Sequence, residues 1–174
     1  ETKAAPAAFD LFNQPGSGQI ENLSAFKSLD NVPHHYQCVQ TELERKLLLQ
    51  TMQRQKSVCF DTETTGLDAV GASIVGVAFS WQAHTGYYVP IPEDADMRKA
   101  ILESLTPFFE NEAIEKVGQN LKYDLKVMQQ HGISVKGKLF DTMLAHYIIN
   151  PDMRHNMDVL AETISGIAPN PSQI

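Results

Sequence analysis

Two acidic side chains, Asp61 and Glu63, stand two residues apart at the end of an apolar stretch. In an extended strand, residues i and i+2 point to the same face, so the two carboxylates would lie side by side. Neighbouring like charges repel and destabilise a fold unless a cation neutralises them. Hard oxygen ligands without nearby Cys or His favour Mg²⁺ or Mn²⁺. The pair therefore indicates a divalent-metal site, although two solvated acids before a turn at Gly66 would show the same spacing.

A second polar cluster occupies residues 118–124, where a short apolar segment runs into a helical pattern. Asn120 is expected to cap that helix, and Asp124 in its first turn would be favoured by the helix dipole. These structural roles leave Lys122 and Tyr123 unexplained. An amine suited to phosphate and an aromatic ring suited to stacking are typical of nucleic-acid binding.

The elements that must position these clusters alternate between strands and helices. We predict strands within residues 36–40, 57–63, 73–81, 86–91, 113–118 and 133–140, and helices within 41–55, 95–110, 121–131, 141–150 and 156–164. Three consecutive strands followed by alternating helices and strands predict an α/β fold, a ribonuclease H-like mixed β-sheet flanked by helices. The side chains expected to face the core from the first two helices are Leu43, Leu47, Leu48, Met97, Ile101, Leu102 and Leu105.

The chain divides into two regions of different composition. Its start is rich in Ala, Pro, Gly, Ser and Asn and lacks periodicity, and the Gln-Pro-Gly-Ser-Gly run at 14–18 is incompatible with a helix interior or a central strand. We therefore expect residues 1–33 to be a linker or a partly ordered arm. Residues 34–174 are long enough for one globular domain with its own core.

Overall charge and composition limit the classes of function. The formal net charge is −7, so the composition does not indicate a basic surface for nucleic-acid binding. An acidic protein that binds a polyanion needs its negative charge offset, and a bound divalent metal would do this. Cys38 and Cys59 stand in apolar or strand-like contexts, and we expect buried free thiols in a reducing compartment. The sequence has no signal peptide and no apolar run of about 18 residues, so we expect no membrane partner and a cytoplasmic location.

Four segments together resemble the 3′→5′ exonuclease (proofreading) domain of bacterial DNA polymerase I, a family A DNA polymerase. Residues 60–64 (Phe-Asp-Thr-Glu-Thr) and 118–124 (Gly-Gln-Asn-Leu-Lys-Tyr-Asp) are similar to its first two motifs. Residues 140–144 and 154–158 resemble the intervening helices in order and spacing. The resemblance covers roughly residues 36–162, and the Asn-x-Lys-Tyr-Asp form is its most specific part.

The resemblance implies a two-metal nuclease site of three aspartates and one glutamate, using Mg²⁺ or Mn²⁺. Asp61 would bridge both metals, Glu63 would hold the nucleophile-side metal and contact the terminal 3′-hydroxyl, and Asp124 would hold the second metal. The implied partners are a single-stranded DNA 3′ end and a covalently linked polymerase domain. By resemblance Leu67 would wedge against the last bases. The full set of implied DNA-binding residues is Thr62, Leu67, Gln119, Asn120, Lys122, Tyr123 and Arg154, of which Arg154 is equally well explained as a surface residue.

One part of the family pattern has no counterpart here. The third motif is a Tyr followed four residues later by Asp, and the only tyrosine after Asp124 is Tyr147, whose fourth follower is Pro151. We expect the domain to be truncated before this motif and the chain to be weakly active or inactive. A segment that is disordered, or a degenerate site, would leave the same sequence.

Two other functions stay open on the sequence. A non-catalytic, exonuclease-like scaffold domain of a polymerase predicts no metal binding. A related 3′→5′ exoribonuclease predicts a preference for RNA, and the Lys122-Tyr123 pair argues against it.

Overall fold

The computed structural model describes residues 32–166. The expected arm at 1–33 lies outside this range apart from its last two residues, and the expected domain continues beyond the range after residue 166.

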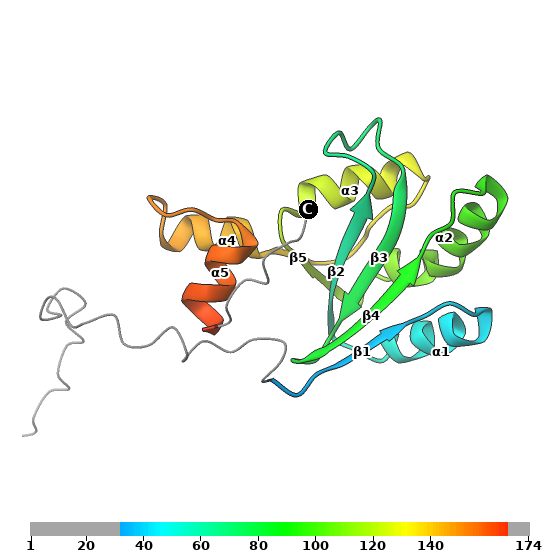
Figure 1. Cartoon of the computed structure of the whole chain (residues 1–174), viewed down its shortest axis with the longest axis horizontal. Coiled ribbons are helices and arrows are strands. Elements are labelled where there is room, and N and C mark those ends of the chain that lie inside the picture. The colour runs from blue at the N-terminus through cyan, green and yellow to red at the C-terminus, as the bar shows by residue number, and fades with distance from the viewer. Residues whose placement is uncertain (1–31, 167–174) are drawn as a thin grey trace, which may run out of the picture.

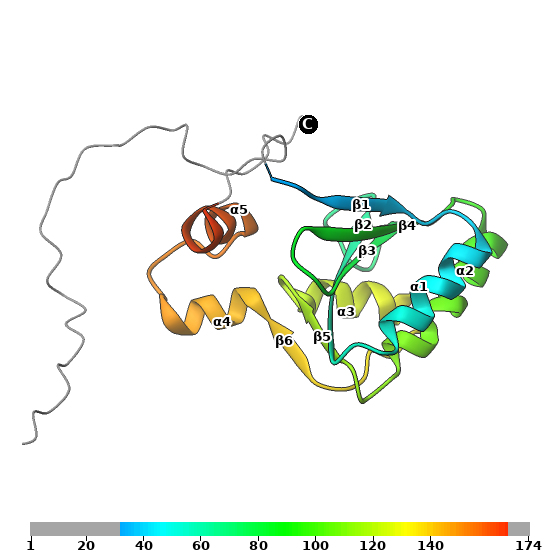
Figure 2. The ribbon, with the colours of Figure 1, turned by 90° about the horizontal axis from the view of Figure 1, so that it is seen from below.

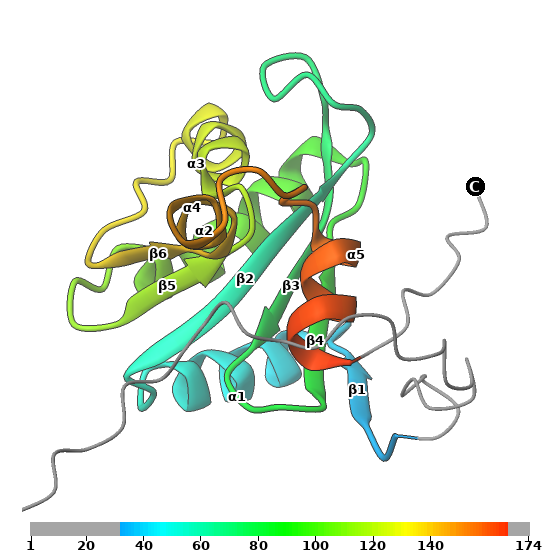
Figure 3. The ribbon, with the colours of Figure 1, turned by 90° about the vertical axis from the view of Figure 1, so that its left-hand side faces the viewer.

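Six strands form one mixed sheet in the spatial order β1-β4-β3-β2-β5-β6, which Figure 3 shows from the side. β2 pairs antiparallel with β3, and β3 antiparallel with β4, whereas the β1–β4, β2–β5 and β5–β6 pairs are parallel. The predicted mixed sheet is therefore confirmed. The strands are β1 (His35–Cys38), β2 (Ser57–Thr64), β3 (Ile74–Ser80), β4 (Thr85–Pro90), β5 (Glu115–Gly118) and β6 (Leu139–Asp141).

The helices lie around this sheet in two groups (Figure 1). In Figure 2, α1 and α2 lie side by side, while α4 and α5 lie together on the opposite side of the sheet. A Thr-x-x-Glu capping box begins α1, because Thr41 Oγ1 accepts the Glu44 amide and the Glu44 carboxylate accepts the Thr41 amide. The helices are α1 (Glu42–Met52), α2 (Ala95–Phe109), α3 (Leu121–Gln130), α4 (Thr142–Ile149) and α5 (Met157–Leu160), the last continued by a π-helical turn at Ala161–Ser165.

The core lies between the sheet and the helices α1, α2 and α3. Phe60 of β2 packs edge-on against Phe109, with ring centroids 5.1 Å apart, and Phe79 of β3 packs the same way against Phe108 at 5.5 Å. These edge-to-face contacts join the sheet to the end of the helix.

Three of the expected core positions were wrong. Leu48 is buried, but Leu43, Leu47 and Met97 are 67%, 54% and 58% exposed. Consecutive helix residues are about 100° apart around the axis, so Leu47 and Leu48 cannot both face the sheet. α1 uses Leu48 and Met52, one turn apart, and both are buried.

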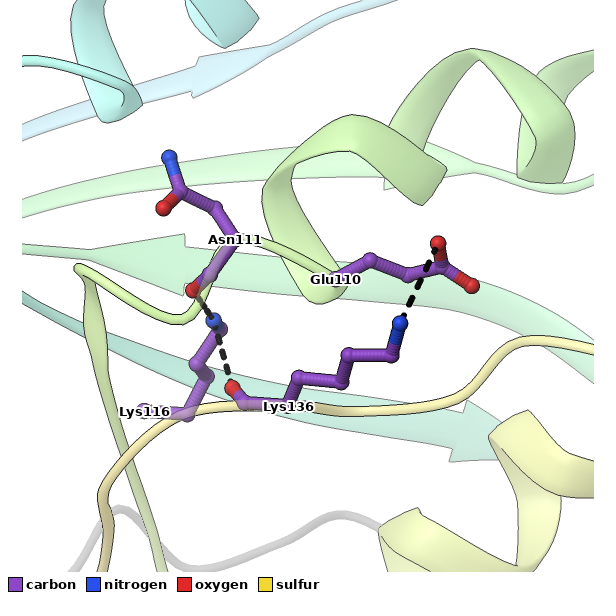
Figure 4. Close-up of polar contacts among 4 residues, drawn as sticks. All are labelled: Glu110, Asn111, Lys116 and Lys136. Atoms are coloured by element: carbon purple, nitrogen blue, oxygen red, sulfur yellow. Dashed lines mark hydrogen bonds and ion pairs between the residues drawn. The ribbon is translucent and has the colours of Figure 1, made fainter.

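A buried amine ties the loop before β6 to the end of α2 (Figure 4). Lys116 of β5 is fully buried, and its Nζ donates to the carbonyl oxygens of Asn111 and, at 2.8 Å, of Lys136. Its burial lowers the pKa of Lys116, an effect that the charge of Glu112 opposes. The two carbonyl groups therefore fix the path of the chain that leads into β6.

The same loop makes a backbone contact that leaves no room for a side chain. Gly137 has a φ of +88°, and an added Cβ would lie 2.9 Å from the Glu112 carbonyl oxygen and 3.0 Å from that of Ile114. A positive φ at this close approach requires glycine.

Within residues 32–166, none of the helices combines the length and the apolar character that crossing a membrane demands.

Candidate metal-dependent nuclease site

The site forms where β2 continues past the end of β5. Cys59 of β2 pairs with Val117, and β5 then ends at Gly118, so the following residues of β2 keep β3 as their ladder neighbour among the described strands. The first turn of α3 occupies the place that a longer β5 would take. Asp124 on this turn accepts the Thr62 backbone amide at 2.9 Å and the Thr62 hydroxyl at 2.6 Å, both on Oδ1. A side chain of α3 thus satisfies an amide of β2.

The two carboxylates of β2 lie on the opposite face from Thr62. Thr62 is buried, while Asp61 is half-buried and Glu63 is exposed, as expected for alternating strand residues. Burial, then the negative charges of Asp124 and Glu63, raise the pKa of Asp61 to about 6. Burial also raises the pKa of Asp124, against the opposing effect of the Thr62 hydrogen bonds. The ionised forms of Asp61 and Asp124 are therefore unfavourable in this environment without a nearby cation.

The donor chemistry fits a hard divalent cation. Carboxylate oxygens are the ligands that Mg²⁺ and Mn²⁺ prefer. Cys59 lies on the same face, and partial desolvation of its sulfur, then the charges of Asp61 and Asp124, raise the pKa of its thiol, which disfavours a thiolate ligand. Within residues 32–166, no three Asp, Glu, His or Cys side chains converge into a complete metal-binding group. The carboxylates thus suit a hard cation by their chemistry, but the described residues do not form a complete binding group.

The expectation of two buried thiols was wrong, because Cys38 and Cys59 are both exposed. Each falls on a strand position that faces away from α2, and the neighbouring Val39 and Phe60 take the core positions. The two cysteines and Asp61 line a hollow of about 550 Å³ on this open face of the sheet.

Tyr123 holds the turn that follows the acidic pair. Its hydroxyl donates to the Gly66 carbonyl oxygen at 2.6 Å and lies 2.6 Å from Thr64 Oγ1. The next residue, Leu67, is 97% exposed. The structure therefore gives Tyr123 a defined role in the turn and presents Leu67 fully to solvent.

The expectation that Asn120 caps α3 was wrong. Asn120 has left-handed backbone angles, φ 58° and ψ 44°, and its side chain makes no capping hydrogen bond. Asp141 caps the helix instead, accepting the amides of Asn120 at 3.1 Å and Leu121 at 2.9 Å. The side chain of Asn120 is exposed, as is that of Lys122, so both are accessible to a ligand.

The remaining two predicted DNA-binding residues differ in their surroundings. Gln119 is occupied at both ends, because its amide donates to the His155 carbonyl oxygen at 2.6 Å and its oxygen accepts the Thr142 hydroxyl. Arg154, the residue before His155, is exposed. Gln119 thus links α3 to the segment that follows α4, and Arg154 is accessible to solvent.

Tyr88 is a neighbour of Glu63 that the sequence reasoning did not identify as part of the site. Gly76 pairs with Glu63, and an added Cβ at Gly76 would lie 2.0 Å from the Tyr88 hydroxyl oxygen. The ring therefore crosses Gly76, and the hydroxyl donates to the Val75 carbonyl oxygen at 3.3 Å. Burial, then the charge of Glu63, raise the pKa of Tyr88. A glycine inside a strand was the available signal, since it often marks such a close approach.

Replacing Thr62 with Val should weaken cation binding by about tenfold, since one hydrogen bond to a carboxylate is worth on the order of 1.5 kcal/mol. The variant keeps the backbone bond to Asp124 but loses the hydroxyl at 2.6 Å. Titration with Mn²⁺ by isothermal calorimetry would measure the change. Thr51→Val is the matched control, because the Thr51 hydroxyl bonds only the Leu47 carbonyl oxygen within α1. Equal Mn²⁺ affinities for Thr62→Val and the wild type would contradict the role of this hydroxyl.

Comparison with known sequences places the chain among nucleases. The model of the family described as 3′-5′ exonuclease matches residues 36–173. DNA polymerase I of Borreliella burgdorferi is 29% identical over 156 residues, which cover 87% of this chain and 17% of that protein. DNA polymerase I of Pseudomonas aeruginosa is 38% identical over 123 residues, covering 65% of this chain and 13% of that protein. The chain thus spans less than a fifth of the length of these relatives.

Comparison with solved structures confirms the ribonuclease H-like fold. The catalytic core of RRP6 from Trypanosoma brucei has a TM-score of 0.64 at 18% identity, covering 88% of this chain and 40% of that one. RNase D from the same organism has a TM-score of 0.66 at 16% identity, covering 79% and 49%. Brucella melitensis NrnC with bound Mg²⁺ has a TM-score of 0.60 at 16% identity, covering 81% and 66%. At these identities the likeness establishes the fold alone.

Proposed function

Since the chain belongs to the 3′-5′ exonuclease domain family of DNA polymerase I, we propose that it removes 3′-terminal nucleotides from single-stranded or frayed DNA. It would do so in proofreading during replication and repair, in the cytoplasm, as one part of a longer polymerase. The observation that best supports this function is the carboxylate arrangement at the end of β5. There Asp124 is bound to β2 through Thr62, and the neighbouring Asp61 has a pKa of about 6 because of burial and of negative charge on Asp124 and Glu63.

Each carboxylate has a distinct part in this proposal. Asp61, Glu63 and Asp124 would hold Mg²⁺ or Mn²⁺, with Thr62 fixing the orientation of Asp124 through two hydrogen bonds. When bound, such metals lower the pKa of an attacking water and stabilise the leaving 3′-oxygen. The family resemblance implies a fourth carboxylate, in a third motif that has no counterpart among these 174 residues.

The exposed residues around the carboxylates would bind the DNA end. Leu67 would contact the terminal base, because its side chain is 97% exposed on a turn that Tyr123 fixes. Lys122 and Asn120, both exposed at the start of α3, would contact phosphates. Arg154 is placed to act in the same way.

Digestion of a 5′-labelled single-stranded DNA oligonucleotide tests the proposal. With Mg²⁺ or Mn²⁺ the wild type should produce a weak ladder that shortens from the 3′ end, since the third motif of the family has no counterpart in this sequence. Asp61→Ala should lower the rate about 10³-fold or more, since metal assistance supplies several kcal/mol of transition-state stabilisation. Asp152→Ala, a change at an exposed acid in the turn after α4, is the matched control and should leave the ladder unchanged.

The alternative functions give different results in the same assay. An RNA of equal sequence digested faster than the DNA would indicate an exoribonuclease. A chain that cleaves neither substrate and gives no heat signal with Mn²⁺ would be a scaffold domain, and the proposal would be wrong.

A further inference from the structure

One carboxylate, that of Asp141, receives hydrogen bonds from the first turns of two helices. We propose that Asp141 is a positioning residue of the site, which caps α3 and α4 together and thereby fixes the helix that carries Asp124. The metal-binding role of Asp124 in this inference rests on the proposed function. The hydrogen bonds of Asp141 to both helices do not depend on it.

The four hydrogen bonds are divided between the two carboxylate oxygens. Oδ1 accepts the amides of Met143 at 2.9 Å and Leu144 at 3.3 Å, which belong to the first turn of α4. The same oxygen accepts the Asn120 amide at 3.1 Å, and Oδ2 accepts the Leu121 amide at 2.9 Å. An ordinary N-cap satisfies amides of its own helix, so the bonds to Asn120 and Leu121 need a separate explanation.

The sheet register brings the two helix starts together. β5 and β6 are parallel, and Gly118 is paired directly with Asp141. Both strands therefore end at the same level, and α3 and α4 begin within three residues of that level. Two positive helix ends then face one negative side chain, which is favourable for both dipoles. Asn120 cannot take over the cap of α3 in its left-handed conformation, in which it makes no capping bond.

The neighbouring Thr142 reinforces the same junction. Its hydroxyl donates to the Gly118 carbonyl oxygen at 3.1 Å and also to Gln119 Oε1. The turn has little room to shift, because an added Cβ at Gly118 would lie 2.4 Å from Leu121 Cδ2 and 3.0 Å from the Phe60 carbonyl oxygen. The start of α3 is thus held against β2 on one side and against the β6–α4 junction on the other.

The distance along α3 from this cap to the site is one helical turn. Asp124 is the fourth residue of α3, and its Oδ1 must reach both hydrogen-bonding groups of Thr62. Fraying of the first turn would move Asp124 away from β2, since helix ends without a cap lose their first hydrogen bonds most readily. Asp141 would therefore act on the metal site without touching the metal.

Amide hydrogen exchange of the 174-residue chain, followed by NMR, tests the double cap directly. In Asp141→Ala the amides of Asn120, Leu121, Met143 and Leu144 should all exchange about tenfold faster or more, and Mn²⁺ affinity should fall several-fold. Asp94→Ala is the matched control. Asp94 caps α2 through the Met97 amide at 2.8 Å, so this variant should affect α2 alone and leave Mn²⁺ binding unchanged.

The conservative change Asp141→Asn isolates the bond to Leu121 and serves where the Ala variant fails to fold. With its oxygen in the Oδ1 position, Asn can still accept the amides of α4 and of Asn120, but it cannot accept the Leu121 amide. Faster exchange at Leu121 with normal exchange at Met143, together with an intermediate Mn²⁺ affinity, is the expected result. Normal exchange at Asn120 and Leu121 in Asp141→Ala, or normal exchange at Leu121 in Asp141→Asn, would overturn the proposal and leave Asp141 as the cap of α4 only. If the wild type itself binds no Mn²⁺, the proposed function fails, while the exchange data still decide whether the double cap exists.

Discussion

Replacing Asp61 with Asn is expected to stabilise the metal-free chain at pH 7.5, by about 1–2 kcal/mol, while it abolishes nuclease activity. Burial and the charges of Asp124 and Glu63 raise the pKa of Asp61 to about 6 in the folded chain, against an ordinary value of 3.8. A carboxyl group whose pKa is higher in the folded state binds more protons there, so stability falls as the pH rises from about 4 to about 6. Above that range the whole penalty is present. The full shift would correspond to about 3 kcal/mol, and partial solvent screening reduces it.

The stabilising effect should disappear under two conditions. At pH 3.5 both proteins carry a neutral group at this position, so they should unfold at similar urea concentrations. In Mg²⁺ the wild type gains stability by binding the ion, whereas the Asn variant does not. Urea unfolding in EDTA and in Mg²⁺ at both pH values would measure these differences, with the exposed Asp152→Asn as control. An Asn variant that is less stable than the wild type in EDTA at pH 7.5 would contradict the repulsion between the carboxylates.

The Lys116→Ala variant should lose about 3–4 kcal/mol of the free energy of unfolding. The fully buried ammonium donates to the Asn111 and Lys136 carbonyl oxygens (Figure 4), and the Phe108 ring centroid lies 5.4 Å away. Truncation would leave buried carbonyl groups without this donor and open a cavity beside the ring. The loop through Gly137, and the strand β6 that follows it, would then no longer be linked to the end of α2. Urea unfolding by circular dichroism would measure the loss.

Two further variants separate the causes of that loss. Lys116→Met keeps most of the volume and removes the donor, so it should recover the cavity part of the free energy only. Lys138→Ala, just before β6, removes an amine that is 77% exposed and pairs with Glu115 at 2.7 Å, and it should cost less than about 0.5 kcal/mol. A Lys116→Met variant as stable as the wild type would show that the two carbonyl groups do not need the ammonium.

Those features of this protein that depend on neighbours in the sequence were predictable from it. The spacing of Asp61 and Glu63 placed them on one face of a strand, because alternation is a property of any extended chain. The Thr41–Glu44 capping box and the glycine at 132, with its φ of +76°, marked helix ends through local hydrogen bonding and backbone conformation. The order of strands and helices then predicted the mixed sheet.

Features that depend on which segments meet were decided by the tertiary structure. Asp124 reaches Thr62 because β5 ends at Gly118 while its partner strand β2 continues. Asp141 replaces Asn120 as the cap of α3 because β5 and β6 end at the same level. The exposure of Cys38 and Cys59 depends on the same arrangement, since α2 covers one face of the sheet. Local patterns carry no information on pairings between residues 20 to 62 positions apart, where loop closure is offset only by the assembled core. The sequence by itself determined the types of chemical group at the site, and the strand pairing determined which of them act together.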